Sequence, residues 1–186
     1  MHYLFTLTMS KQNSSERKYK MTIHNPASGF HRVTHDRPLI EQHIDAYRMK
    51  GKLPEPTVCP QCNAVFHKGR WQWMQAPMDA HSETCPACHR QNDDFPAGYV
   101  SLSGDFFDAH SEEILRVVRN HEQHERKEHP LKRIMAIEKQ ADATLVTTTD
   151  IHLARGIGEA VHHAYQGELD LHYNPGENQL RGYWQR

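Results

Sequence analysis

The sequence has 186 residues, of which 37% are hydrophobic and 24% are charged, and its formal net charge is -1. This length allows one domain or two small ones, and the near-neutral charge excludes a protein that attracts nucleic acid through its overall field. The sequence contains no apolar run near the roughly 18–20 residues of a membrane span and no recognisable secretory signal, so we expect a cytoplasmic protein without a membrane partner.

The N-terminal part is more basic than the rest of the chain. Residues 1–50 contain eight Lys and Arg against four Asp and Glu. The polar stretch 10–36 lacks hydrophobic periodicity, so we expect residues 1–36 to form a disordered basic arm. Such an arm suits an anionic partner surface, and a solvated tail is an equally good interpretation. For residues 37–56 we expect a short helix and a linker, because Asp36 can cap a helix and the prolines near residue 56 favour extended chain.

The cysteines give the most specific signal and define a module at residues 57–96. Two C-x2-C pairs, Cys59/Cys62 and Cys85/Cys88, are separated by 22 residues. Each pair can form a tight knuckle, and four thiolates together complete a tetrahedral Zn²⁺ site. Asn63 and His89 follow the knuckles, where residues that tolerate positive φ are favoured. We therefore expect one structural zinc ion in a zinc-ribbon-like module.

Other cysteine chemistries explain the spacing less well. Two disulfides are disfavoured in a cytoplasmic protein, and a thioredoxin-like site uses one active pair, not two matched pairs. A rubredoxin-like iron site uses the same four ligands, so ligand type alone leaves iron open. His67, His81 or His89 could replace one cysteine, although four thiolates already suffice.

Between the two pairs, the segment AVFHKGRWQW predicts a tight hairpin. Three loop residues ending at Gly69 fit a type I turn followed by a left-handed position. Lys68 and Arg70 at the tip can reach phosphates, and Trp71 and Trp73 on one face can stack on bases or pack beside the metal. With Arg90 after the second pair, these five residues are the candidate RNA contacts.

Residues 97–186 predict an α+β domain with the order β-α-β-β-α-β-β. The expected helices start near Asp108 or Ser111 and at the cap Asp150. Gly156 and Gly158 are expected to bring the second helix close to the sheet. The NPGE segment, residues 174–177, fits a type II turn, and the last strand places Leu180, Gly182 and Trp184 on one face. Two such helices can cover one face of a mostly antiparallel sheet, a small α/β sandwich.

Motifs for catalysis are missing from the sequence. It contains no Ser/His/Asp arrangement, no phosphate-binding loop and no G-x-G-x-x-G. His121 and His124 lie one helical turn apart and could bind metal weakly, but a solvated charged helix face is the better interpretation. We expect a non-enzymatic protein with no small-molecule substrate.

Three stretches together resemble one family: CPQCNAVFHKGRW, CPACHR running into AGYVSLSG, and TLVTTTDIHLARGIGEAVHHAYQGEL. The chain is similar, over about residues 57–175, to the N-terminal half of the large ribosomal subunit nuclear-export adaptor, and looks like a bacterial zinc-ribbon offshoot of it. The resemblance implies zinc ligation by the four cysteines, a Gly-Arg-Trp element at Arg70 and Trp71, and affinity for the large subunit. The chain departs from the family by having fewer knuckles, no further β-rich domain, and Asn63 where Gly is common.

We therefore expect a zinc-stabilised protein that binds the ribosome or structured RNA, with a role in translation control or ribosome protection under stress. The alternative is a zinc-ribbon transcriptional or redox-responsive regulator, which would release zinc and form disulfides under mild oxidant. A metalloenzyme is a third possibility and would need an open coordination position.

Overall fold

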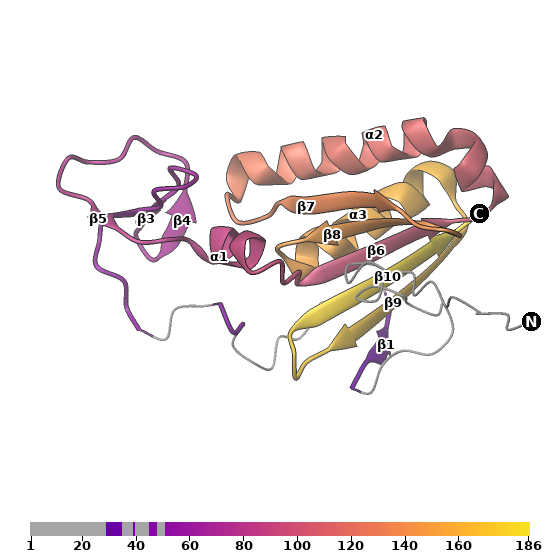
Figure 1. Cartoon of the computed structure of the whole chain (residues 1–186), viewed down its shortest axis with the longest axis horizontal. Coiled ribbons are helices and arrows are strands. Elements are labelled where there is room, and N and C mark those ends of the chain that lie inside the picture. The colour runs from indigo at the N-terminus through magenta and orange to yellow at the C-terminus, as the bar shows by residue number, and fades with distance from the viewer. Residues whose placement is uncertain (1–28, 35–38, 40–44, 48–50) are drawn as a thin grey trace, which may run out of the picture.

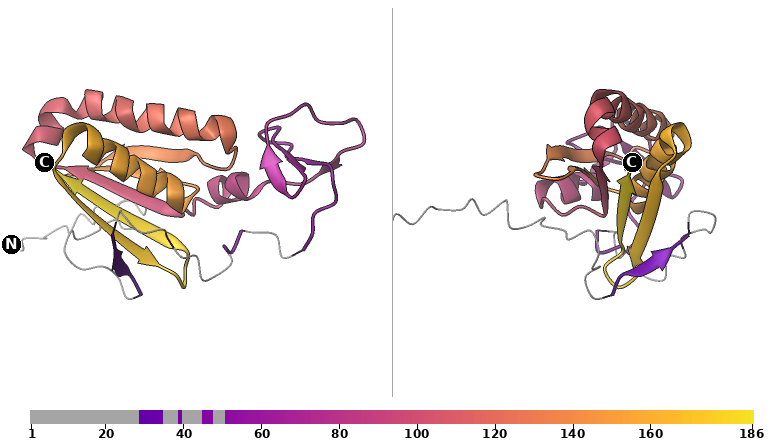
Figure 2. Two further views of the ribbon diagram at one scale, coloured as in Figure 1. Left: turned by 180° about the vertical axis from the view of Figure 1, so that it is seen from behind. Right: turned by 90° about the vertical axis from the view of Figure 1, so that its right-hand side faces the viewer.

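The computed structural model describes residues 29–34, 39, 45–47 and 51–186 (Figure 1). Residues 1–28 of the expected basic arm and most of the expected helix between residues 37 and 51 lie outside the described residues. The described chain has two parts, a cysteine module and an α+β domain, joined end to end (Figures 1 and 2). No helix in the described ranges combines the length and apolarity needed to cross a bilayer.

The larger part is an α+β domain, which confirms the predicted class. Its six-stranded sheet has the order β1-β9-β10-β6-β8-β7. The elements in chain order are β1 (His31–Val33), β6 (Gly98–Ser103), α2 (Asp105–Glu128), β7 (Ile134–Lys139), β8 (Thr144–Thr148), α3 (Ile151–Tyr165), β9 (Glu168–Asn174) and β10 (Gln179–Gln185).

The sheet is antiparallel except at its centre. Strand β10 runs parallel to β6, with Leu180 opposite Gly98 and Trp184 opposite Leu102. It pairs antiparallel with β9 on its other side. Two segments about 80 residues apart in sequence are therefore hydrogen-bonded neighbours in the middle of the sheet.

One face of the sheet carries the core, and both helices pack on that face (Figure 2). Because side chains alternate along a strand, the register places one set of apolar residues together under α2 and α3. This set consists of Val100, Leu102, Val146, Leu171, Tyr173, Leu180 and Trp184. Leu180 and Trp184 are both fully buried, as the alternation in the last strand predicted.

The helix starts follow different rules. At α3 the predicted cap is confirmed, since the Asp150 carboxylate accepts a 2.8 Å hydrogen bond from the Leu153 amide. Helix α2 begins at Asp105, before the predicted start at Asp108 or Ser111. Gly104, with φ of 102°, precedes it. Gly104 reaches that φ because it lacks a Cβ, and a side chain there would also meet the backbone of Arg186.

The two α3 glycines face different neighbours. A Cβ on Gly158 would lie 3.1 Å from Leu169 Cδ1 of β9, so this glycine does bring α3 close to the sheet. A Cβ on Gly156 would instead lie 2.5 Å from Nε2 of His121. The expectation that Gly156 faces the sheet is therefore wrong, and it faces α2.

Two local predictions are corrected. Residues 31–33, assigned to the disordered arm, form β1 and pair with β9, because this short segment completes an edge of the sheet. The prediction of a type II turn at residues 174–177 is also wrong, since the positive φ falls on Asn178 and not on Gly176. The Asn174 side chain organises this loop by accepting hydrogen bonds from the amides of Gly176 and Glu177.

The cysteine module contains a small four-stranded sheet and one short helix. The strand order is β4-β3-β2-β5, and the elements are β2 (Thr57–Val58), β3 (Val65–His67), β4 (Arg70–Gln72), β5 (His81–Ser82) and α1 (Pro86–Asn92). The buried cluster around its cysteines consists of Cys59, Cys85, Ala87 and Cys88. A module of this small size needs a source of stability besides its core.

Candidate metal centre

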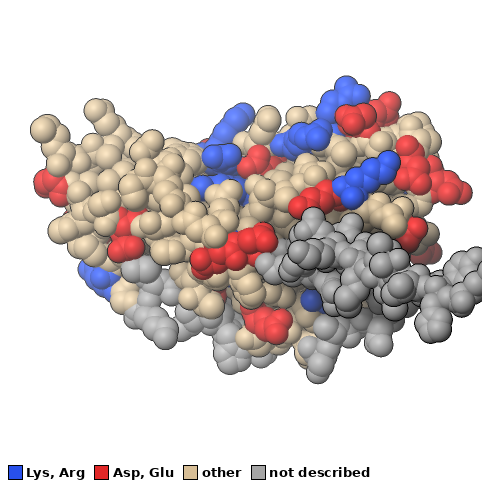
Figure 3. All heavy atoms as spheres, viewed as in Figure 1, with Lys and Arg blue, Asp and Glu red and all other residues tan. Residues whose placement is uncertain are grey.

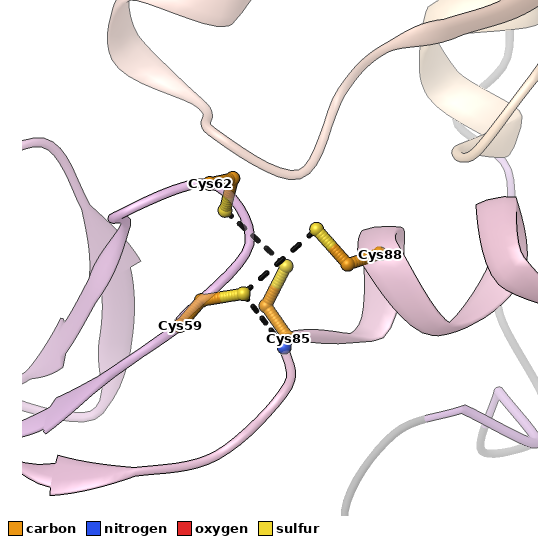
Figure 4. Close-up of side chains that lie close together, drawn as sticks. All are labelled: Cys59, Cys62, Cys85 and Cys88. Atoms are coloured by element: carbon orange, nitrogen blue, oxygen red, sulfur yellow. Dashed lines mark hydrogen bonds between the residues drawn. The ribbon is translucent and has the colours of Figure 1, made fainter.

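The four cysteine sulfurs converge on one point between β2, β3 and α1 (Figure 4). The Sγ atoms of Cys59 and Cys88 lie 3.8 Å apart, and those of Cys62 and Cys85 lie 3.7 Å apart. All four sulfurs lie within 4.8 Å of one another. These separations are far longer than the S–S bond of about 2.05 Å in a disulfide, so the thiols are free.

The sulfur positions fit a tetrahedral metal ion. Four thiolates bound at about 2.3 Å define a tetrahedron with edges of about 3.8 Å. Three of the cysteines are almost completely buried, at 0% exposure for Cys59 and Cys85 and 3% for Cys88. The geometry and the chemistry of the donors therefore make these four residues a site that can hold a metal ion, as the spacing predicted.

The first cysteine pair forms the predicted knuckle. The Cys59 amide donates to the carbonyl of Ala64, and the Asn63 amide donates to the carbonyl of Cys59, and both hydrogen bonds are 2.8 Å long. Asn63 has φ of 63°, the left-handed conformation expected at this position. The tight return of the chain places Cys59 and Cys62 on the same side of the loop.

The second pair is built differently. Cys85 precedes α1, whose first residue is Pro86, and Cys88 lies in its first turn. The expectation that His89 occupies a left-handed knuckle position is wrong, because His89 is a residue of this helix. A helical turn brings Cys85 and Cys88 to one side without requiring a positive φ.

The environments of the thiols differ. Burial opposes ionisation of Cys59, but backbone N–H groups, including that of Cys85 at 3.3 Å, lower the pKa of Cys59 to about 7. Burial raises the pKa of Cys85 and of Cys88, and Arg133 partly offsets this effect at Cys88. Metal binding to buried thiols displaces their protons, so the affinity of such a site depends on pH.

The α+β domain also contributes to the site. Arg133, which precedes β7, is only 4% exposed. Its Nη2 donates to Cys62 Sγ at 3.0 Å, and its Nη1 donates to Cys88 Sγ at 3.3 Å. Leu131 packs against the same cysteine cluster. Sequence reasoning missed Arg133, since it lies 45 positions after Cys88 and no local spacing connects it to the cysteines.

Histidines and carboxylates take no part in the cluster. Among the residues that the structure describes, the four cysteines form the only group of His, Cys, Asp or Glu suited to a metal ion. His67 faces Glu55 at 3.8 Å, and His121 packs against α3 at Gly156. A shell of four thiolates has no position for substrate or water, which suits a structural metal and not a catalytic one.

The hairpin above the site has a tighter turn than expected. Only Lys68 and Gly69 connect β3 to β4, with φ of 52° and 77°. The prediction of a three-residue loop is therefore wrong. Positive φ at both central residues is typical of a type I′ turn. The Glu55 carboxylate accepts hydrogen bonds from both turn amides, at 2.6 and 3.2 Å.

The candidate contact residues of the hairpin separate into two groups. Lys68 and Arg70 are exposed at the tip. Trp71 packs beside the cysteine cluster and against Phe66, with ring centroids 5.6 Å apart. Trp73 is 40% exposed, and its indole N–H donates to the carbonyl of Arg126 at 2.6 Å. The indole of Trp71 therefore packs inside the module, and the indole of Trp73 is partly exposed to solvent.

Trp73 borders an open groove of about 490 Å³ between the hairpin and the C-terminal half of α2. The other lining residues are Glu122, Gln123, Arg126 and Lys127. Figure 3 shows Lys and Arg side chains gathered where the cysteine module meets this end of α2. The groove thus combines a flat aromatic surface with two cations and one carboxylate.

Arg90 does not belong to the exposed set. It is 2% exposed, and its guanidinium donates to Asp45 Oδ1 at 2.5 Å and to the carbonyl of Phe95 at 3.0 Å. It also stacks on Tyr47, with Cζ 4.6 Å from the ring centroid. The expectation that Arg90 contacts RNA is therefore corrected, because its guanidinium is buried and bonded to Asp45 and Phe95.

Comparisons of the chain with protein-family models, with curated proteins and with solved structures found no match.

Proposed function

We propose that this chain is a non-enzymatic, zinc-stabilised protein that binds structured RNA of the large ribosomal subunit. The observation that carries the proposal is the convergence of four cysteine sulfurs at the base of an exposed basic hairpin. The resemblance of its motifs to the export-adaptor family supports the choice of the large subunit. A role in translation control or ribosome protection under stress, in the cytoplasm, is part of the same proposal.

Zinc is the metal we propose, because a closed shell of four thiolates is typical of structural zinc sites. The buried cluster that holds the cysteines contains only one further buried side chain, Ala87. A structural Zn²⁺ supplies an apparent binding free energy of about 10–16 kcal/mol at neutral pH, and this becomes folding free energy for such a module. The four cysteines would hold the ion, and the ion would fix the hairpin relative to α1.

The RNA contacts we propose are the exposed residues of the hairpin and the groove. Lys68 and Arg70 lie at the turn, where they can reach phosphate oxygens. Trp73 offers an indole face for stacking on an unpaired base, held in place by its bond to Arg126. Arg126 and Lys127 border the same groove and add positive charge.

The test is co-sedimentation of the purified chain with separated large and small ribosomal subunits at about 50 and 200 mM salt. We expect binding to large subunits that weakens as salt rises, because phosphate contacts release counterions. The double variant Lys68→Gln/Arg70→Gln should reduce the slope of log K against log[salt] by about 1.4–1.8, at roughly 0.7–0.9 per lost contact. Lys139→Gln, at the exposed end of β7, is the matched control.

Two results would contradict the proposal. A chain that stays in the soluble fraction at about 50 mM salt, where phosphate contacts are strong, has no such affinity. Equal salt slopes for the hairpin variant and for Lys139→Gln would show that the hairpin is not the contact. Metal analysis of the same preparation, with an expected ratio of one zinc per chain, tests the metal separately.

A further inference from the structure

A buried guanidinium joins the two parts of the molecule at the cysteine site. Besides its contacts to Cys62 and Cys88, the Arg133 side chain approaches Cys85 Sγ at 3.7 Å. The same residue is fastened in the α+β domain. Its Nε donates to the Pro130 carbonyl at 2.7 Å, and its amide donates to Thr149 Oγ1 at 3.0 Å. Arg133 is thus fixed at both ends.

The surroundings of Arg133 require negative charge on the sulfurs. A buried guanidinium is costly unless an anion compensates it. Within the described residues, its other acceptors are the Pro130 carbonyl and the Gln91 amide oxygen at 3.3 Å, both of them neutral. The cysteine sulfurs are then the anionic partners, and four thiolates around one divalent cation carry an excess of two negative charges.

We propose that Arg133 is a positioning residue that couples metal binding at the four cysteines to docking of the cysteine module on the α+β domain. Its guanidinium offsets the excess charge of the metal-bound thiolates and thereby raises the affinity for the metal. The metal in turn holds the sulfurs as thiolates and thereby strengthens the contact between the two parts. Coupling of this kind is reciprocal, so each effect predicts the other.

The coupling explains why the module is attached where it is. Leu131 packs on the cysteine cluster and Arg133 enters it, so one short segment before β7 supplies both the apolar and the charged contact. Thr149 secures this segment, since its hydroxyl donates to the Leu131 carbonyl at 2.6 Å. Metal occupancy can therefore be transmitted from the sulfurs to the edge of the six-stranded sheet through three residues.

The first test measures metal affinity by competing Zn²⁺ away from the full-length chain with a chromophoric chelator. We expect Arg133→Met to weaken Zn²⁺ binding by about 10–100-fold, the usual effect of losing a partner of the metal ligands. Arg133→Lys keeps the charge with fewer donors in a less suitable geometry, so its loss should be smaller. Arg90→Met is the matched control, because Arg90 is buried nearby without contacting sulfur.

The second test uses the unaltered chain and remains decisive if Arg133→Met fails to fold. Amide hydrogen exchange is compared with Zn²⁺ bound and after its removal. We expect faster exchange without metal at Arg133 and Thr149, whose amides are bonded across this segment. Unchanged exchange at these two amides would overturn the proposal, as would equal affinity losses in Arg133→Met and Arg90→Met.

The inference rests on the metal site of the proposed function and not on RNA binding. If the unaltered chain binds no Zn²⁺, the proposed function fails along with this inference. If it binds Zn²⁺ with an affinity that Arg133→Met leaves unchanged, only the coupling fails.

Discussion

The indole N–H of Trp73 donates a 2.6 Å hydrogen bond to the carbonyl of Arg126, and this bond joins the cysteine module to α2 at a second point. It orients an indole that is 40% exposed beside Arg126 and Lys127. The residue thus combines a fixed orientation with an accessible aromatic face, which is the arrangement needed to stack on an unpaired base.

Removal of this aromatic face should weaken RNA binding. We expect Trp73→Ala to lower the affinity for structured RNA that carries an unpaired base by roughly 5–150-fold, because stacking of one base contributes about 1–3 kcal/mol. Trp73→Phe retains a stacking ring and should lose less. The measurement is fluorescence anisotropy of a labelled oligonucleotide with each variant. Equal affinities for Trp73→Ala and the unaltered chain would exclude Trp73 as a stacking residue.

Loss of one sulfur ligand should destabilise the cysteine module and leave the α+β domain folded. In Cys62→Ser a weaker ligand replaces a thiolate, so we expect the zinc content to fall well below one per chain and the module to lose its fixed structure. The α+β domain has its own core and should still unfold cooperatively. Metal analysis and limited proteolysis around residues 57–92 check both statements. A variant that keeps full zinc and full protease resistance would contradict the assigned ligand.

The start of β6 has no space for a side chain. A Cβ on Gly98 would lie 2.3 Å from Ala154 Cβ and 2.5 Å from Thr148 Oγ1. We expect Gly98→Ala to lower the free energy of unfolding by about 1–3 kcal/mol, as overpacking of a core does. Gly51→Ala is the matched control, because no residue that the structure describes lies within 4 Å of its Cβ position. Urea denaturation compares the two, and equal midpoints would contradict the close packing of β6 on α3.

Stability should fall in mild acid because of His121. Burial lowers the pKa of His121, and Lys132 and His124 add to this effect against the opposing charges of Glu125 and Glu159. The unfolded chain then binds a proton more readily than the folded one, so stability is fully present above the unfolded pKa of about 6.5 and is lost as pH falls through and below it.

The pH effect can be isolated by substitution. In His121→Gln the decline of unfolding free energy between about pH 7 and pH 5 should be shallower than in the unaltered chain. His129→Gln, at an exposed position directly after the same helix, controls for a general loss of histidine. If both variants show the decline of the unaltered chain, His121 does not cause it.

Local signals in the sequence were sufficient for much of the α+β domain and for the cysteine cluster. The Asp150 cap and the alternation that buries Leu180 and Trp184 depend on neighbours a few residues away, and both are confirmed. The two C-x2-C pairs are equally local, and their convergence was predicted from spacing.

Features set by distant contacts could not be read in the same way. Arg133 reaches sulfurs up to 71 positions earlier in the chain, and Arg90 is buried by residues 45–47. Strand β1 has only three residues, too few for an alternating pattern, and exists because β9 offers an edge. The two-residue turn at Lys68 and Gly69 is also bonded to a distant residue, because the Glu55 carboxylate accepts from the Lys68 amide.

The position of β10 between β9 and β6 constrains the order in which the molecule assembles. All four cysteines precede residue 89, so they come earlier in the chain than the strand that forms the middle of the sheet. Until residues 179–185 arrive, β6 has one unpaired side and Leu102 lacks Trp184 as its neighbour. Contacts of such long sequence separation slow folding, so we expect the pairing of β10 with β6 to form more slowly than the local β3–β4 hairpin of the cysteine module.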